Sequence, residues 1–133
     1  MTDRELVDRA REMQERAYVP YSNFRVGAAL LCEDGTVVTG CNVENASYGL
    51  CICGERTAMV KAVSEGHRKF KAIAIAGDTD GPCVPCGACR QFIREFASSL
   101  DMPVYCVGKD NEHVSYTLDE LLAHSFGPAD LGK

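Results

Sequence analysis

The sequence predicts an α/β fold in which helices accompany a mixed β-sheet. Helical and strand-like segments follow one another along the 133 residues in the order α-β-β-α-β-α-β-β-α. Strands separated by helices favour crossover connections and some parallel pairing. The first two strand-like segments are joined at Asp34-Gly35, a turn that is typical of an antiparallel hairpin. A mixed sheet in one domain spanning residues 1–133 is therefore expected.

The first half of the chain predicts a helix followed by the hairpin. Thr2 and Glu5 match a capping box, and apolar residues recur behind them at helical spacing. A cluster containing proline and asparagine at 20–23 ends this segment. The apolar, β-compatible segments at 24–32 and 36–43 are expected to form the two strands.

The second half predicts three more helices and three more strands. Gly66 is a stop signal for the first of these helices, and the next strand is an apolar run that ends at Gly77. Four apolar residues at helical spacing, beginning at Cys89, mark a further helix face. In order, the expected elements are a helix at 55–65, a strand at 71–77, a loop at 78–85, a helix around 89–96, strands at 103–107 and 113–116, and a short helix at 118–124.

Charge and hydropathy exclude several classes of partner. Lys and Arg number 14 against 19 Asp and Glu, so the net charge is −5 and gives no general footprint for a phosphate backbone. No segment has the ~18 apolar residues that span a bilayer, and residues 1–5 lack the apolar region of a secretory signal. We expect a cytoplasmic protein with neither a nucleic-acid nor a membrane partner.

The eight cysteines point to a metal or catalytic site. Without a secretory signal, thiols, metal ligands or catalysis are favoured over disulfides. Cys86 and Cys89 form a C-x-x-C at a predicted helix start, and Cys53 lies at another. Three thiolates from two helix N-termini can therefore converge on one ion. Cys32, Cys41 and Cys106 are interpreted as buried side chains of strands, and Cys83 as a loop thiol.

Two residues beside Cys53 predict chemistry at that ion. Zinc with three protein ligands keeps a fourth position open, as in catalytic sites. Glu55 would then carry protons rather than bind metal. This requires Cys53 to precede the regular helix, because residues two apart inside a helix diverge by roughly 200°. Arg56 would donate hydrogen bonds to the sulfur and withdraw negative charge.

Two other interpretations stay open on spacing alone. A closed structural zinc site would recruit Cys51 or Cys83 as the fourth ligand. A redox C-x-x-C would expect a thioredoxin-like context and would leave Cys53 without a role. Glu55 and Arg56 next to Cys53 favour the catalytic interpretation.

The motifs resemble one enzyme family. Segments 53–58 (CGERTA) and 85–91 (PCGACRQ), together with 26–30, 40–48 and 125–128, resemble the homotetrameric zinc-dependent cytidine deaminases, almost end to end. The resemblance implies a three-layer α/β/α fold with a five-stranded mixed sheet. It also implies one Zn²⁺ per subunit, and a homotetramer whose active sites are shared between subunits.

The resemblance implies hydrolytic deamination of cytidine and deoxycytidine to uridine and deoxyuridine with release of ammonia, in pyrimidine salvage. Cys53, Cys86 and Cys89 would be the zinc ligands. In zinc deaminases as a class, activated water attacks the amino-bearing carbon while a glutamate moves protons. Glu55 would deliver them to N3 and to the leaving amine.

The resemblance also implies the substrate contacts. Asn42 and Glu44 match residues that hold the ribose, and Phe24 matches one that packs beside sugar and base. The backbone around Gly54 and Ser47 would read the pyrimidine edge. The positions matching contacts from an adjacent subunit are Ala46, Tyr48 and Phe126.

The sequence departs from the family pattern at two places. Most relatives carry alanine at the position of Gly54, and many carry proline and glycine where this chain has Gly49 and Cys51. Glycine is expected to loosen the helix start slightly. Competing functions are deamination of a modified cytosine nucleoside such as blasticidin S, editing of a polynucleotide, and a zinc-stabilised binding module without catalysis.

Overall fold

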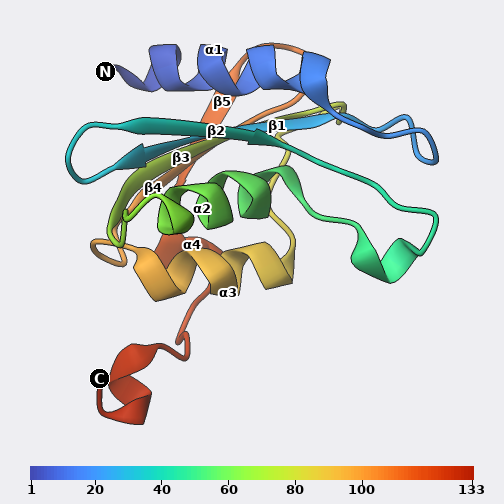
Figure 1. Ribbon diagram of the computed structural model, residues 1–133. Coiled ribbons are helices and arrows are strands. Elements are labelled where there is room, and N and C mark those ends of the chain that lie inside the picture. Colours follow the sequence, from blue (N-terminus) through green and yellow to red (C-terminus); the bar gives the residue numbers. More distant parts are fainter.

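A five-stranded sheet forms the middle of the computed structural model, which describes residues 1–133 (Figure 1). Its strand order is β2-β1-β3-β4-β5, and only β3 and β4 pair in parallel. The strands are β1 (Val26–Cys32), β2 (Val37–Cys41), β3 (Phe70–Gly77), β4 (Pro103–Val107) and β5 (His113–Thr117). The predicted mixed sheet with an antiparallel hairpin is confirmed.

Helices cover both faces of the sheet. One face carries α1, and the other carries α2, α3 and α4 (Figure 1). This confirms the three-layer α/β/α arrangement that the resemblance implies. The helices are α1 (Asp3–Met13), α2 (Gly54–Ser64), α3 (Gly87–Phe96) and α4 (Leu118–Leu121), with short 3₁₀ turns η1 (Gln14–Arg16), η2 (Tyr48–Leu50) and η3 (Pro128–Leu131). No helix is both long enough and apolar enough to cross a membrane.

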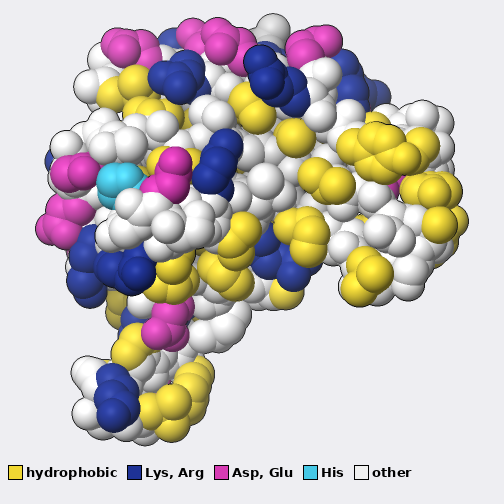
Figure 2. All heavy atoms as spheres, viewed as in Figure 1, with side chains coloured by type: hydrophobic (Ala, Val, Ile, Leu, Met, Phe, Trp, Pro, Cys, Tyr) yellow, Lys and Arg dark blue, Asp and Glu magenta, His cyan; other side chains and the backbone are white.

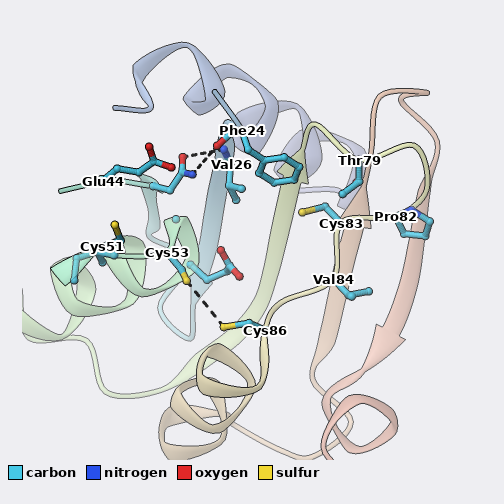
Figure 3. A pocket seen from close by; sticks show the side chains of 14 residues that line it. Phe24, Val26, Glu44, Cys51, Cys53, Thr79, Pro82, Cys83, Val84 and Cys86 are labelled. Atoms are coloured by element: carbon cyan, nitrogen blue, oxygen red, sulfur yellow. Dashed lines mark hydrogen bonds between the residues drawn. The ribbon is translucent and has the colours of Figure 1, made fainter. Parts of the chain in front are cut away.

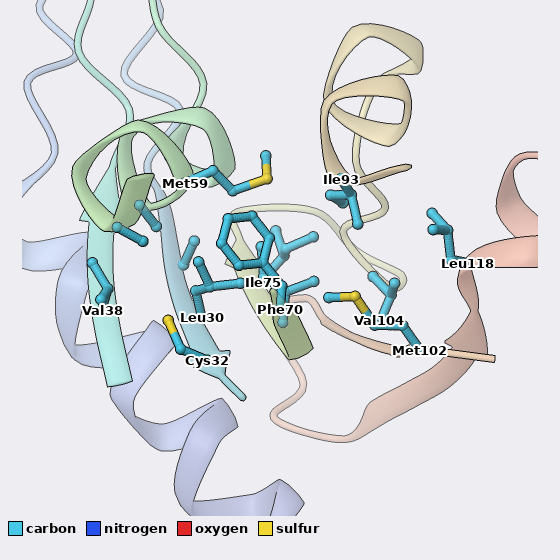
Figure 4. Close-up of a cluster of buried hydrophobic side chains, with 14 of the residues drawn as sticks. Leu30, Cys32, Val38, Met59, Phe70, Ile75, Ile93, Met102, Val104 and Leu118 are labelled. Atoms are coloured by element: carbon cyan, nitrogen blue, oxygen red, sulfur yellow. The ribbon is translucent and has the colours of Figure 1, made fainter. Parts of the chain in front are cut away.

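The hydrophobic core is divided by the sheet. On the α2 and α3 side, Ile73 and Ile75 of β3 join a cluster that includes Phe70 and Ile93 (Figure 4). On the α1 side, the alternate residues of β3 are small alanines, which contact the apolar face of the helix. Because β3 is buried on both faces from Ala72 onward, its sequence after Lys71 is a continuous apolar run.

The outer face of α1 is charged, as its sequence pattern predicts. Figure 2 shows acidic and basic side chains along it, and Leu6, Val7 and Ala10 face the sheet. The Thr2 side chain caps the helix by accepting a hydrogen bond from the Glu5 backbone N–H at 3.1 Å. The helix is thus fixed at the end where the sequence pattern places its start.

The main differences from the sequence prediction are the start of β1 at Val26 instead of residue 24, the ends of two elements, and one unpredicted turn. The second strand stops at Cys41, because Val43 leaves the hairpin and bridges both Tyr18 and Ile52. The last helix ends at Leu121 instead of reaching His124, because Leu122 leaves the helical region at φ −142° and ψ 68°. The short η3 turn near the C-terminus has no counterpart in the sequence prediction.

Candidate active site

Three cysteine sulfurs meet where two helices begin. Cys53 is the N-cap of α2 and Cys86 is the N-cap of α3, and neither side chain makes a capping hydrogen bond. Cys89 lies in the first turn of α3 and is buried. The Sγ atoms of Cys53 and Cys86 are 4.0 Å apart (Figure 3), and all three sulfurs lie within 4.8 Å of one another. The structure therefore brings together the three residues that spacing singled out.

The donor set of this cluster fits zinc. Tetrahedral coordination with Zn–S bonds of about 2.3 Å separates the sulfurs by about 3.8 Å, close to the separation seen here. Thiolates are soft ligands that suit zinc. The partial positive charge at a helix N-terminus favours the thiolate form. Small movements of Cys53, Cys86 and Cys89 would complete such a site.

No fourth cysteine joins the cluster. Cys51 lies to one side, where its sulfur accepts a hydrogen bond from the Asn45 backbone N–H at 3.4 Å. Cys83 packs beside Gly77 at the end of β3, and burial raises the pKa of its thiol to about 11. The geometry thus favours an open three-thiolate site over the closed structural site that spacing alone leaves possible.

A guanidinium supports the cysteine cluster. Arg56 donates from Nη2 to the Cys53 sulfur at 3.4 Å, as its position three residues along α2 predicts. Hydrogen bonding from the Cys89 thiol, and then from Arg56, lowers the pKa of Cys53 to about 5. The pKa of Cys89 is raised, because its proton is shared with the Cys53 sulfur. One negative charge is therefore stabilised in the cluster beside a fixed cation.

Glu55 is a buried carboxyl group beside the sulfurs. It is the second residue of α2 and is 4% exposed. Burial raises its pKa to about 7, and the nearby Cys53 sulfur adds to the shift. Because Cys53 precedes the regular helix, both side chains line the same cavity. The geometric condition set by the sequence is met.

The cavity has a volume of about 400 Å³ and opens beside the cluster (Figure 3). Cys53, Cys86 and Glu55 line it together with Phe24, which reaches it from the segment before β1. Gly54 also lines it, and a methyl group there would lie 3.1 Å from the carbonyl oxygen of Val26. An alanine at this position would therefore need β1 to shift by a few tenths of an ångström.

Asn42 and Glu44 also line the cavity and hold its upper wall in place. The Asn42 side chain accepts from the Val26 backbone N–H at 2.9 Å and donates to the Phe24 carbonyl oxygen at 2.8 Å. Glu44 accepts hydrogen bonds from the backbone N–H groups of residues 21 and 22 and from the Ser22 hydroxyl. These hydrogen bonds lower the pKa of Glu44, with the Ser22 hydroxyl contributing most.

The opposite wall comes from a loop that the sequence does not assign to the site, apart from Cys83 as an alternative fourth zinc ligand. Thr79, Pro82, Cys83 and Val84 lie there, between the end of β3 and Cys86 (Figure 3). The place of this loop in the chain could have predicted its role. It joins the central strand to the helix that carries Cys86 and Cys89, so it must pass beside the site.

Four of the predicted substrate residues do not line this chain's own cavity, namely Ala46, Ser47, Tyr48 and Phe126. Tyr48 is 72% exposed in η2, and Ala46 is exposed in the segment before it. Phe126 is 57% exposed near the C-terminus, where its carbonyl oxygen accepts from the Gln91 side chain at 2.9 Å. Within one chain these side chains do not join Phe24 and Asn42.

Comparisons with known proteins agree with this geometry. A family model described as the cytidine and deoxycytidylate deaminase zinc-binding region matches residues 1–106, a span that includes the cysteine cluster and Glu55. The chain belongs to this family. The family match accounts for the donor set, because the matched domain is a zinc-binding one.

Individual family members are similar over nearly their whole length. A cytidine deaminase from Sporosarcina psychrophila is 51% identical over 126 residues, covering 95% of this chain and 92% of the relative. A probable cytidine deaminase from Dictyostelium discoideum is 50% identical over 94% of this chain and 84% of the relative. The crystal structure of cytidine deaminase from Burkholderia pseudomallei has a TM-score of 0.90 and 47% identity, covering 95% of this chain and 100% of that one.

Proposed function

We propose that the protein is a zinc-dependent cytidine deaminase that hydrolyses cytidine and deoxycytidine to uridine and deoxyuridine with release of ammonia. The observation that carries this proposal is the open three-thiolate cluster beside a buried glutamate in a nucleoside-sized cavity. Residues 1–133 would form one deaminase domain holding one Zn²⁺. Its place would be in pyrimidine salvage in the cytoplasm.

Cys53, Cys86 and Cys89 would hold the zinc ion. When bound there, zinc supplies Lewis acidity, which lowers the pKa of water so that it can act as a nucleophile near neutral pH. Both N-cap cysteines come from helices anchored in the core, which fixes the donor set before metal arrives.

Glu55 would move the protons of the reaction. Its side chain is confined in the cavity and excluded from bulk solvent, so a proton that it takes from water stays beside the substrate. The carboxyl group would deliver this proton to N3 of the base. A second transfer would carry the remaining proton of the hydroxyl group added at C4 to the amine, which leaves as ammonia when the C4–N bond breaks. The sum is cytidine plus water giving uridine plus ammonia.

The upper wall of the cavity would bind the nucleoside. Phe24 offers an aromatic face to the sugar and base, and Asn42 and Glu44 border the same space. Asn42 retains one amide N–H, and Oε2 of Glu44, which accepts only from the Ser22 hydroxyl, retains acceptor capacity. These groups can hold ribose hydroxyls, and the Gly54 backbone can contact the pyrimidine edge.

The reaction is tested with purified zinc-loaded protein. We expect the absorbance of cytidine and of deoxycytidine to fall with equimolar release of ammonia. Blasticidin S should be turned over far more slowly, and single-stranded DNA or RNA should remain unedited. A protein that processes blasticidin S but leaves cytidine untouched would contradict the proposed substrate.

Arg56→Gln is expected to lower zinc affinity by about 10–100-fold, because the sulfur of Cys53 would lose its charged hydrogen-bond donor. Competition with a chromophoric chelator measures the affinity. The matched control is Arg68→Gln, which removes a guanidinium that contacts only backbone carbonyl groups far from the cluster. Equal zinc affinities in the two variants would remove Arg56 from the proposed site.

We further propose a homotetramer in which Ala46, Tyr48 and Phe126 complete the cavity of an adjacent subunit. The exposed apolar surface around η2 supports this proposal, and Figure 2 shows hydrophobic side chains gathered on that lobe. Such side chains are typical of an interface when they lie close together on a surface.

Phe126→Ala is expected to raise the KM for cytidine by about 30-fold, because a buried aromatic anchor at an interface contributes on the order of 2 kcal/mol. Sedimentation should give four subunits for the unmodified chain. Val114→Ala, at another exposed apolar residue, is the control and should leave both values unchanged. An active monomer would refute the shared site.

A further inference from the structure

The backbone of Arg25 connects two residues of the cavity wall. It lies between Phe24 and Val26, and both of these line the cavity. Strand β1 begins at Val26, whose partner Gly77 is the last residue of β3. The backbone of Arg25 thus lies just beyond the last pair of the sheet, where no strand holds it.

The side chain of Asp78 holds Arg25 in place of a neighbouring strand. Its carboxylate accepts from the Arg25 backbone N–H at 2.9 Å and from Nε at 3.2 Å. The other carboxylate oxygen accepts from Nη2 at 3.3 Å. Burial raises the pKa of Asp78, but the hydrogen bonds from Arg25 outweigh this effect, so the pKa lies below its usual range. The side chain continues the pairing of β1 and β3 by one residue.

The side chain of Gln14 binds both Arg25 and Asp78. Its Nε2 donates to the Arg25 carbonyl oxygen at 3.1 Å and to Asp78 Oδ1 at 3.3 Å. The residue is 3% exposed, so these hydrogen bonds are shielded from water. Both backbone polar groups of Arg25 are therefore fixed on the β3 side, while Asn42 fixes the neighbouring groups on the β2 side.

This arrangement bears directly on Phe24. A methyl group on Gly77 would lie 3.7 Å from Phe24 Cε1, so the ring rests against the end of β3. Asp78 follows Gly77 and begins the loop that forms the opposite wall. One carboxylate thus links the segment carrying Phe24 to the loop carrying Thr79 and Cys83, although Asp78 itself does not line the cavity.

We infer that Asp78 is a positioning residue, which acts with Gln14 through the backbone of Arg25 to hold Phe24 against the nucleoside. The inference rests on the proposed function. An aromatic side chain fixed before binding costs less conformational entropy when substrate arrives. Loss of the clamp should therefore weaken substrate binding and leave the proton chemistry at Glu55 largely intact.

The test is a double-mutant cycle between Asp78→Asn and Phe24→Leu, measured as KM and kcat for cytidine with zinc-loaded protein. The asparagine side chain would keep the shape but place an amide group against the guanidinium. Alone, Asp78→Asn should raise KM about tenfold with kcat within about threefold. In the Phe24→Leu background the same change should alter KM by less than about twofold. If Asp78 only stabilised the fold, the substitution would reduce the fraction of folded protein. The apparent kcat would then fall while KM stayed unchanged.

Two further variants make the outcome decisive. Asp34→Asn removes a carboxylate that accepts a backbone hydrogen bond in the β1–β2 turn, and it should leave KM unchanged. If Asp78→Asn fails to fold, Gln14→Met is measured in its place and judged by the same changes in KM and kcat. It removes the hydrogen bonds from Gln14 to Arg25 and Asp78. Unmodified protein that does not deaminate cytidine overturns the proposed function. Active unmodified protein with an unchanged KM in the variant, or with additive effects in the cycle, overturns this inference alone.

Discussion

Replacing Glu55 with glutamine is expected to lower kcat for cytidine by about 10²–10⁴-fold, the usual contribution of a positioned proton carrier. Glutamine keeps the size of the side chain but cannot take a proton from water and deliver it to N3. Steady-state kinetics with zinc-loaded protein measure the effect. KM should change little, because the aromatic and polar groups of the upper wall remain in place.

The Glu55→Gln variant should fold at least as well as the unmodified chain. The neutral amide is cheaper to bury than a carboxylate, and the position is 4% exposed. A loss of activity with unchanged zinc content and thermal midpoint would therefore report chemistry. Glu65→Gln, at the exposed far end of α2, is the matched control. Normal turnover by zinc-loaded Glu55→Gln would contradict the assigned role.

Replacing Cys86 with serine is expected to abolish both zinc retention and turnover. A hydroxyl is a far poorer ligand than a thiolate, so the affinity loss should exceed the roughly 100-fold that a partner of a ligand can cost. Elemental analysis after dialysis measures the zinc content, and the cytidine assay measures turnover. Chelator treatment of the unmodified chain should reproduce the effect, with recovery when zinc is added.

The control for this variant is Cys41→Ser. Cys41 lies at the end of β2, outside the cluster, and its sulfur donates to the Arg16 carbonyl oxygen at 3.4 Å, a contact that serine can keep. It should retain zinc and activity. A Cys86→Ser protein with full zinc content and full turnover would show that the cluster is not the metal site.

The sequence predicted the order of elements because local signals here agree with tertiary packing. The alternating alanines and isoleucines of β3 make a continuous apolar run, which is the pattern of a strand covered on both faces. The cysteine cluster was predictable for a similar reason. Each ligand lies at a helix start, and helix starts carry strong sequence signals such as Pro85.

The cavity wall was harder to predict, because it depends on contacts between segments that are distant in the chain. The clamp of Asp78 and Gln14 on Arg25 joins residues that are 64 and 53 positions apart, and no periodicity records such a contact. The end of the last helix was missed because Leu122 leaves the helical conformation, with φ −142° and ψ 68°, although no glycine or proline there marks a stop. The roles proposed for Tyr48 and Phe126 require an adjacent subunit, so the structure of one chain does not display them.

The zinc ligands and the cavity lie at one end of the central strands, and the opposite end of the sheet is free of them. Val26 and Gly77 meet beside the cavity, whereas the Asp34-Gly35 turn lies at the opposite end of the sheet, near His67. Gly35 and Gly66 both have positive φ there, and neither has a neighbour that an added methyl group would touch. Peptide tags or extra residues inserted at this distal rim would therefore extend into solvent, away from the zinc ligands, so the rim offers a natural attachment point for immobilising or labelling the enzyme.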